Sequence, residues 1–317
     1  MARLLRVYFN AMFGALGGLL GWMLFGEFLG SPQGAGDSKP PWEWWEQALY
    51  GGAIVGALIG YFVVSVDAIL DRALVRFCRY AAYGIVLGAV GGALGSWLGD
   101  WVNVKLAQES AEAARFDIVG KLLARGLGWM LFGLFVGVSE GIASRSLGKI
   151  TYGAIGGSLG GFIGGAVFAY LMILMTPGEE SYVWGQAIGL IILGACIGAL
   201  TALVEDIFKP AAVKVLRGWQ EGREYPIVKG TSVVGRDEGV DILILRDMKV
   251  EKRHALIQRR GNEFVLVNND APPRHTLVND EPVAQFCKLF DGDRIQLGGV
   301  VLRFLMRQAK ERPRGAK

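Results

Sequence analysis

Residues 234–257 read Val234-Gly-Arg-Asp-Glu-Gly-Val-Asp-Ile-Leu-Ile-Leu-Arg-Asp-Met-Lys-Val-Glu-Lys-Arg-His-Ala-Leu-Ile257. Short apolar segments alternate here with glycine, aspartate and other charged residues, which is typical of short β-strands joined by turns. The pattern continues on both sides and predicts eight strands, at 225–228, 232–235, 242–245, 254–259, 263–268, 275–278, 294–297 and 300–305. So many short strands within about 90 residues predict an all-β sandwich with no long helix.

The rest of the chain has a different composition. Of its 317 residues 52% are apolar and the mean hydropathy is +0.36. Only 28 of the 62 Asp, Glu, Lys and Arg residues precede residue 211, whereas 37 of the 47 glycines do. Such a division predicts a multi-domain protein. We expect a polytopic α-helical membrane domain at 1–206, a basic linker at 207–221, the sandwich at 222–308 and a basic tail at 309–317.

The first 206 residues contain stretches long enough to cross a membrane. A helix needs about 20 apolar residues to span the hydrocarbon core of a bilayer. Five stretches without a charged residue meet this length: 7–26, 47–66, 80–99, 150–178 and 181–204. Residues 126–139 form a sixth, shorter stretch that spans only if Lys121, Arg125 and Glu140 lie at the ends of the helix. The sequence therefore predicts six transmembrane helices.

Basic residues gather in the loops on one side of these six helices. They are Arg3 and Arg6, then Arg72, Arg76 and Arg79, then Arg145 and Lys149, and finally Lys209, Lys214 and Arg217. The opposite loops are acidic or mixed. The positive-inside rule then places both termini in the cytoplasm, with the chain passing several times through a plasma or inner membrane and contacting its lipid.

An internal repeat runs through the predicted membrane domain. Phe13-Gly-Ala-Leu-Gly-Gly-Leu-Leu-Gly21 aligns with Leu87-Gly-Ala-Val-Gly-Gly-Ala-Leu-Gly95 and with Gly156-Gly-Ser-Leu-Gly-Gly-Phe-Ile-Gly164, while Gly-x-x-x-Gly occurs at 56–60, 133–137 and 194–198. We interpret this as three helical hairpins with the same orientation. Glycines four residues apart let helix backbones approach closely, as in a glycine zipper, and an unused glycine face would allow a homo-oligomer.

Acidic residues in the membrane domain lie near the predicted helix ends. Asp67, Glu140 and Glu205 each have a basic residue nearby, and we expect ion pairs with Arg72, Arg145 and Lys209 in turn. A proton or ion relay is the alternative reading of these three acids. A channel would need polar groups at mid-bilayer, and the sequence provides almost none there.

Two groups of motifs in the C-terminal region carry a resemblance to a known family. Val234-Gly-Arg236, Asp241-Ile-Leu-Ile244, Asp247 and Val250-Glu-Lys-Arg-His-Ala-Leu-Ile257 resemble the front half of a forkhead-associated (FHA) domain. Thr276-Leu-Val-Asn279, Glu281-Pro-Val283 and Asp291-Gly-Asp-Arg-Ile-Gln-Leu-Gly298 resemble its back half. The resemblance covers residues 222–308. It implies an eleven-stranded sandwich that binds phosphothreonine peptides on the loops at one end, with no catalysis.

The resemblance also implies roles for single residues. Arg236 follows Gly235 at the position of the family's phosphate-binding arginine, and a planar guanidinium suits a phosphate dianion. Glu251 stands where the family has a phosphate-binding serine, and Lys252 keeps the cation that often follows it. Arg253 precedes His254, which matches the family's structural histidine.

The second loop departs from the family's Asn-Gly-Thr, which holds the peptide backbone. Arg274, His275 and Thr276 occupy these positions, so the asparagine is lost, and Arg274 is a replacement cation. We expect Thr276 and Asn279 to belong to the same partner-binding surface. A carboxylate at 251 repels phosphate, so three functions stay open for the domain: phosphate-dependent binding, phosphate-independent protein binding, or a purely structural module.

Other chemistry is not indicated. The sequence has no P-loop, no H-E-x-x-H, no G-x-S-x-G and no cluster of Cys and His with metal spacing, so we expect neither an enzyme nor a cofactor or metal. Cys78, Cys196 and Cys287 are widely spaced and read as reduced packing residues. We predict a membrane-anchored module that recruits a cytoplasmic protein, with or without a phosphorylated threonine, and binds no nucleic acid. The alternative is a channel or transporter regulated by the cytoplasmic domain.

Overall fold

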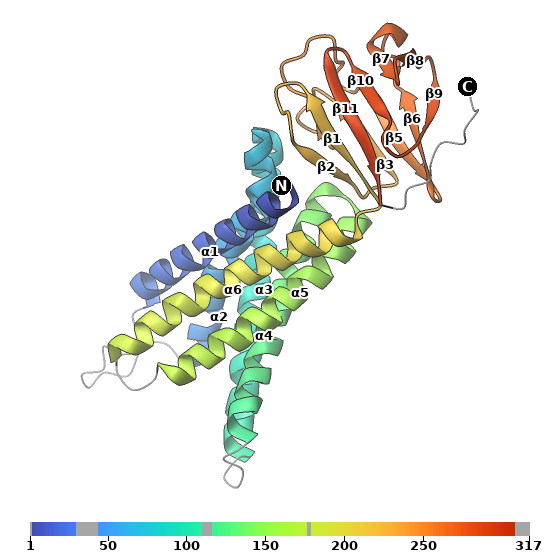
Figure 1. The fold of residues 1–317 in the computed structure, drawn as a ribbon. Coiled ribbons are helices and arrows are strands. Elements are labelled where there is room, and N and C mark those ends of the chain that lie inside the picture. The colour runs from blue at the N-terminus through green and yellow to red at the C-terminus, as the bar shows by residue number, and fades with distance from the viewer. Residues whose placement is uncertain (1, 30–43, 110–115, 176–178, 308–317) are drawn as a thin grey trace. The chain divides into compact units, whose positions relative to one another are not determined.

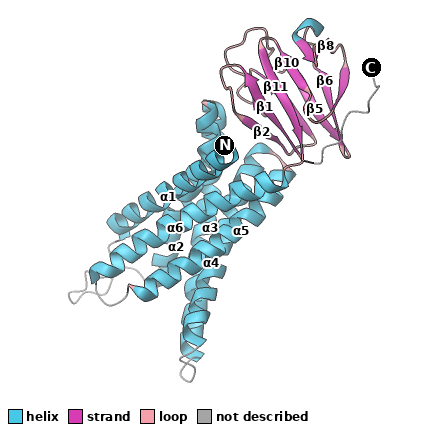
Figure 2. Cartoon of the chain, viewed as in Figure 1, coloured by secondary structure: helices cyan, strands magenta, loops and turns pink. Residues whose placement is uncertain are grey.

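The computed structural model describes residues 2–29, 44–109, 116–175 and 179–307, so the predicted basic tail at 309–317 lies outside the described residues. The chain divides into two compact units, one built from helices and one mainly from strands (Figures 1 and 2). The helices are α1 (Ala2–Leu29), α2 (Trp44–Asp71), α3 (Leu74–Glu109), α4 (Phe116–Ser144), α5 (Leu147–Leu174) and α6 (Glu179–Phe208). All six are long and apolar enough to cross a membrane, as predicted.

Glycines bring the backbones of neighbouring helices together. Methyl groups added at Gly56 of α2 and Gly133 of α4 would collide with the carbonyl oxygens of Gly88 in α3 and Gly157 in α5. A methyl group at Gly194 of α6 would collide in the same way with the carbonyl oxygen of Gly14 in α1. The last contact joins the two ends of the helical series, so the six helices form a closed ring in which α6 meets α1 as α2 meets α3.

Each odd-numbered helix contacts both of its neighbours through glycine. In α5, for example, Gly157 faces α4, whereas a Cβ at Gly160 would lie 2.6 Å from the Cα of Ile197 in α6. The equivalent glycines of the repeat, Gly14 with Gly17 and Gly88 with Gly91, divide between neighbouring helices in the same manner. Equivalent glycines of the sequence repeat therefore make equivalent helix contacts. Glycine contacts also join each expected hairpin to the next one, so the three hairpins are not separate.

The interior of the helical unit is apolar. Val55 and Ile59 of α2, Phe132 and Val136 of α4, and Leu193 and Ile197 of α6 are buried in one continuous cluster. Dispersion between such closely packed side chains holds helices together in lipid. Buried hydroxyl side chains, at Ser65, Ser139 and Thr201, follow these apolar positions along the same three helices.

Charged side chains join the helices at one end of this cluster. Arg6 of α1 donates hydrogen bonds to Asp67 of α2 at 2.8 Å and to Glu205 of α6 at 2.7 Å, and Lys149 of α5 pairs with Glu140 of α4. The predicted partners of Glu140 and Glu205 were therefore wrong. Arg145 lies in the tight turn between α4 and α5, and Lys209 pairs instead with Asp206 and Glu224 at 2.5 Å each. Spacing along the chain predicted ion pairs between residues close in sequence, whereas the observed pairs of Glu140 and Glu205 join different helices.

The C-terminal unit is a sandwich of two sheets. One sheet has the order β2-β1-β11-β10-β7-β8 and the other β4-β3-β5-β6-β9. The strands are β1 (Ala211–Arg217), β2 (Glu224–Ile227), β3 (Thr231–Gly235), β4 (Ile242–Leu243), β5 (Ala255–Arg260), β6 (Glu263–Asn268), β7 (Thr276–Val278), β8 (Glu281–Pro282), β9 (Phe286–Leu289), β10 (Arg294–Leu297) and β11 (Val300–Met306). A short 3₁₀ turn, η2 (Pro273–His275), precedes β7.

The predicted basic linker at 207–221 was wrong. Residues 211–217 form β1, an interior strand that pairs antiparallel with β11 and β2. Its apolar residues Ala211, Val213 and Val215 alternate into the core, where Val213 is fully buried. Lys214 at an alternate position and Arg217 at the end of the strand gave this segment the appearance of a basic linker. Only Lys209 and Pro210 remain between α6 and the sandwich.

Candidate functional site

Several loops meet at one end of the sandwich. β3 ends there at Gly235, and the antiparallel pairing of β3 with β5 and of β5 with β6 brings the start of β5 and the end of β6 to the same level. The loops 244–254 and 269–275 therefore lie together. The turn at 298–299 joins them, because the Gly298 amide donates to the His275 carbonyl at 2.9 Å.

A chain of buried hydrogen bonds supports these loops. His254 is fully buried, and its Nδ1 accepts a hydrogen bond from the Glu251 amide at 3.0 Å. Its Nε2 therefore carries the proton and donates to Thr276 Oγ1 at 3.0 Å, and that hydroxyl donates to Asn268 Oδ1 at 3.3 Å. Burial lowers the pKa of His254 and keeps the ring neutral. The imidazole thus supports the loops from inside and presents no atom to a ligand.

Backbone hydrogen bonds hold the loop after β3 against the loop before β5. The amides of Arg236 and Asp237 donate to the carbonyls of Glu251 and Lys252 at 3.1 Å each. A Cβ at Gly235 would collide with the Lys252 carbonyl, so only glycine permits this approach. The geometry makes Gly235 a structural requirement for placing Arg236.

Arg236 is a half-buried arginine without a carboxylate partner. Its Nε is buried and has no hydrogen-bond partner in the structure, and no ion pair involving this side chain occurs in the described part of the chain. A buried donor without a partner costs about 1–3 kcal/mol, and a bound anion would remove that cost. The side chains of Glu251, Lys252 and Arg253 next to it are all exposed.

Two asparagines also support the site, and neither was predicted from the sequence. Asn269 donates from its amide side chain to the Arg253 carbonyl at 2.8 Å, and its backbone amide donates to the His254 carbonyl at 3.1 Å. Asn268 donates to the Ala271 carbonyl at 2.7 Å. Adjacent asparagines at the end of a strand favour such side-chain bonds to loop backbone, which is the signal that was available in the sequence.

The C-terminal region of the chain is similar to several known proteins. The family model described as the cytoplasmic domain of the inner membrane component of T3SS matches residues 214–308. The glycogen accumulation regulator GarA of Mycolicibacterium smegmatis is 36% identical over 95 residues, which are 30% of this chain and 58% of that protein. The oxoglutarate dehydrogenase inhibitor of Corynebacterium jeikeium is 34% identical over 108 residues, which are 34% of this chain and 73% of that protein.

The chain belongs to the forkhead-associated family through its C-terminal sandwich. Solved FHA structures are similar to it as well. One, from a structural and functional analysis of phosphothreonine-dependent FHA domain interactions, is 30% identical, covering 31% of this chain and 97% of that one, with a TM-score of 0.28. The FHA domain of FhaA, solved in a complex with an intracellular domain, is 29% identical, covering 30% and 98%, with a TM-score of 0.27.

Two of the residues that we assigned to the binding surface of the FHA domain lie elsewhere. Thr276 is fully buried in the His254 network, so its side chain supports the loops from below. Asn279 lies at the other end of β7, where it donates to Asp293 at 2.8 Å and accepts from the Arg294 amide at 3.0 Å. β7 runs away from the site, so Asn279, which follows the strand, lies at its far end and Thr276 lies at its near end. Arg274, in η2, is exposed on the site side.

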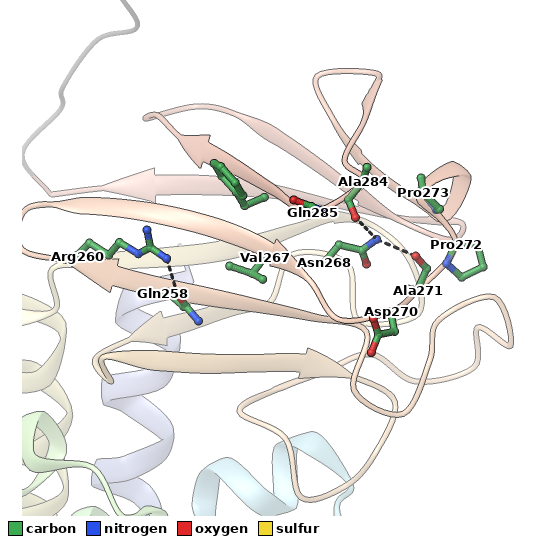
Figure 3. A pocket seen from close by; sticks show the side chains of 11 residues that line it. Gln258, Arg260, Val267, Asn268, Asp270, Ala271, Pro272, Pro273, Ala284 and Gln285 are labelled. Atoms are coloured by element: carbon green, nitrogen blue, oxygen red, sulfur yellow. Dashed lines mark hydrogen bonds between the residues drawn. The ribbon is translucent and has the colours of Figure 1, made fainter.

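A separate hollow of about 520 Å³ lies beside the loop 269–275 of the FHA domain (Figure 3). Gln258 and Arg260 of β5, Val267 of β6 and the loop residues Pro272 and Pro273 line it. Figure 3 shows the Asn268 side chain, which also lines the hollow, donating to the carbonyls of Ala271 and Ala284. The hollow contains none of the residues that we predicted for phosphate binding.

Groups of three or more metal-ligating side chains do not occur among the described residues.

Proposed function

We propose that this protein is a membrane-anchored FHA module that recruits a phosphothreonine-containing protein to a plasma or inner membrane, with both termini in the cytoplasm. The observation that carries the proposal is Arg236. It is a half-buried arginine at the family's phosphate position, placed by Gly235 and left with an unpartnered buried Nε. A phosphate dianion would satisfy that donor with a charge-assisted hydrogen bond.

The membrane-anchoring half of the proposal draws support from two findings. Six helices have the length and composition of membrane spans, and the matching family model describes the cytoplasmic domain of an inner membrane component. The related FHA structure whose study concerns phosphothreonine-dependent interactions supports the partner class. The apolar layers around Ile59 and Val136 speak against the alternative of a channel.

The Glu251 carboxylate would repel a bound phosphate, and the exposure of its side chain weakens this repulsion. Two like charges about 4 Å apart repel by about 4 kcal/mol at an effective dielectric of 20. The Glu251 side chain is exposed, and only its backbone bonds to His254 and Arg236 are structural. It is therefore free to turn into solvent, where screening weakens the repulsion. Lys252, next to it, adds a compensating positive charge.

The test is a titration of the full chain in detergent micelles with a degenerate phosphothreonine peptide library and its unphosphorylated twin. We expect binding that depends on the phosphate and falls at least about tenfold in Arg236→Ala, since a lost charge-assisted bond is worth about 1.5–3 kcal/mol. Arg303→Ala, which removes an exposed arginine from β11, is the matched control and should bind as the wild type does. Equal affinity for both libraries would refute phosphate-dependent recruitment.

A further inference from the structure

A second surface lies at the same end of the FHA domain as Arg236. It consists of Trp219, of Arg246, which lies over the Trp219 ring, and of Met248, two residues after Arg246 in the same loop, and we call it the Trp219 patch. β1 ends at Arg217 opposite Val301, so the loop after β1 lies at the same end as the turn at 298–299. Trp219 is 41% exposed and Met248 is 79% exposed, although both are large apolar side chains.

The patch is held in shape by the loop that crosses this end of the sandwich. Arg246 lies with its guanidinium 4.3 Å from the centre of the Trp219 ring, a cation–π contact between loops 218–223 and 244–254. Asp247 accepts hydrogen bonds from the Gly299 amide at 2.6 Å and from the Lys249 amide at 2.9 Å. The patch is therefore preformed, and little conformational entropy would be lost when a ligand bound it.

The charge around the patch is mostly positive. Arg246, Lys249, Lys252, Arg253 and Arg274 are exposed and form no ion pair within the described residues. The exposed acids of the same loops are Glu221, Glu251 and Asp270. Asp247 is already engaged by backbone amides. A stacked guanidinium keeps its edge free to donate two parallel hydrogen bonds, which suits a carboxylate.

We propose that the Trp219 patch binds a short acidic and apolar segment of the same partner that carries the phosphothreonine. The inference rests on the proposed function of Arg236 and names what else the partner must contain. Arg246 and Lys252 are six positions apart in the crossing loop, a span of at most about 20 Å in extended chain. The acidic and apolar segment therefore lies within about six residues of the phosphothreonine. The Trp219 indole and the Met248 thioether would pack against an apolar side chain of this segment. The Arg246 guanidinium would donate hydrogen bonds to one of its carboxylates.

The experiment compares two phosphothreonine libraries on the full chain in detergent micelles. Six positions on each side of the phosphothreonine are drawn from Asp, Glu, Leu and Phe in one library, and from Gly, Ser and Asn in the other. We expect about tenfold tighter binding of the first library. Arg246→Gln and Met248→Ser should each reduce that preference to about twofold or less, without weakening the binding of the neutral library. Phe286→Ser, which removes another exposed aromatic residue, should keep it.

The outcomes separate this inference from the proposed function. Phosphate-dependent binding with no preference between the libraries, or a preference that survives in Arg246→Gln, would overturn the inference and leave the proposed function standing. If phosphorylation makes no difference, the proposed function fails. An unphosphorylated Asp, Glu, Leu and Phe library that binds the wild type and not Arg246→Gln would then uphold the Trp219 patch alone. No binding by that library either would overturn both.

Discussion

Glu251 is the residue whose replacement should most improve phosphate binding. In Glu251→Ser the like charge is removed and a hydroxyl replaces it, so the affinity for the phosphothreonine library should rise at least about tenfold. The same titration measures this gain. Glu281→Ser removes an exposed acid from β8 and should leave the affinity unchanged. An unaltered affinity in Glu251→Ser would show that neither the remaining repulsion nor the new hydroxyl affects phosphate binding.

His254 should make the stability of the sandwich depend on pH. Burial lowers its folded-state pKa below the ordinary value of 6.5, so the unfolded chain binds a proton more readily. Its contribution is fully present above pH 6.5 and is lost as the pH falls through the folded-state pKa. Thermal unfolding of the full chain, followed from pH 7.5 to 5, should show this decline. His254→Asn should flatten it, whereas His275→Gln should preserve it.

At the scale of elements, β1 decides where a soluble fragment must begin. A fragment of residues 220–317 lacks the strand between β2 and β11 and exposes the core that Val213 and Val215 cover. We expect residues 209–317 to unfold cooperatively and residues 220–317 to aggregate or remain unfolded. Circular dichroism melting of the two fragments checks this. Equal melting temperatures would show that β1 is dispensable.

The glycine contacts between helices should tolerate substitution only where space exists. A Cβ at Gly137 would collide with the Gly153 carbonyl, so Gly137→Ala should destabilise the helical unit by about 1–3 kcal/mol. At Gly99 the nearest atom would be 3.7 Å away, so Gly99→Ala is the matched control and should be neutral or slightly stabilising. Thermal unfolding in detergent compares the two. Similar stability of both variants would argue against backbone contact at Gly137.

For the whole molecule, the distribution of basic loops predicts the topology. A reporter enzyme fused after Lys317 should be active only in the cytoplasm, because an even number of spans follows a cytoplasmic N-terminus. A second reporter in the loop after α1 should be active only on the opposite side. Activity of the Lys317 fusion outside the cytoplasm would remove one predicted span. It would also place the FHA domain away from any cytoplasmic partner.

The sequence by itself determined the six helices, the repeat and the sandwich, because hydrophobic periodicity and glycine spacing are local properties of the chain. It also located Gly235, Arg236 and His254, since their motifs are contiguous. Tertiary structure alone decided the pairing of Arg6 with Asp67 and Glu205, the placement of Asn279 away from the site, and the use of residues 211–217 as a strand. These features depend on which distant segments meet, and spacing along the chain does not encode that.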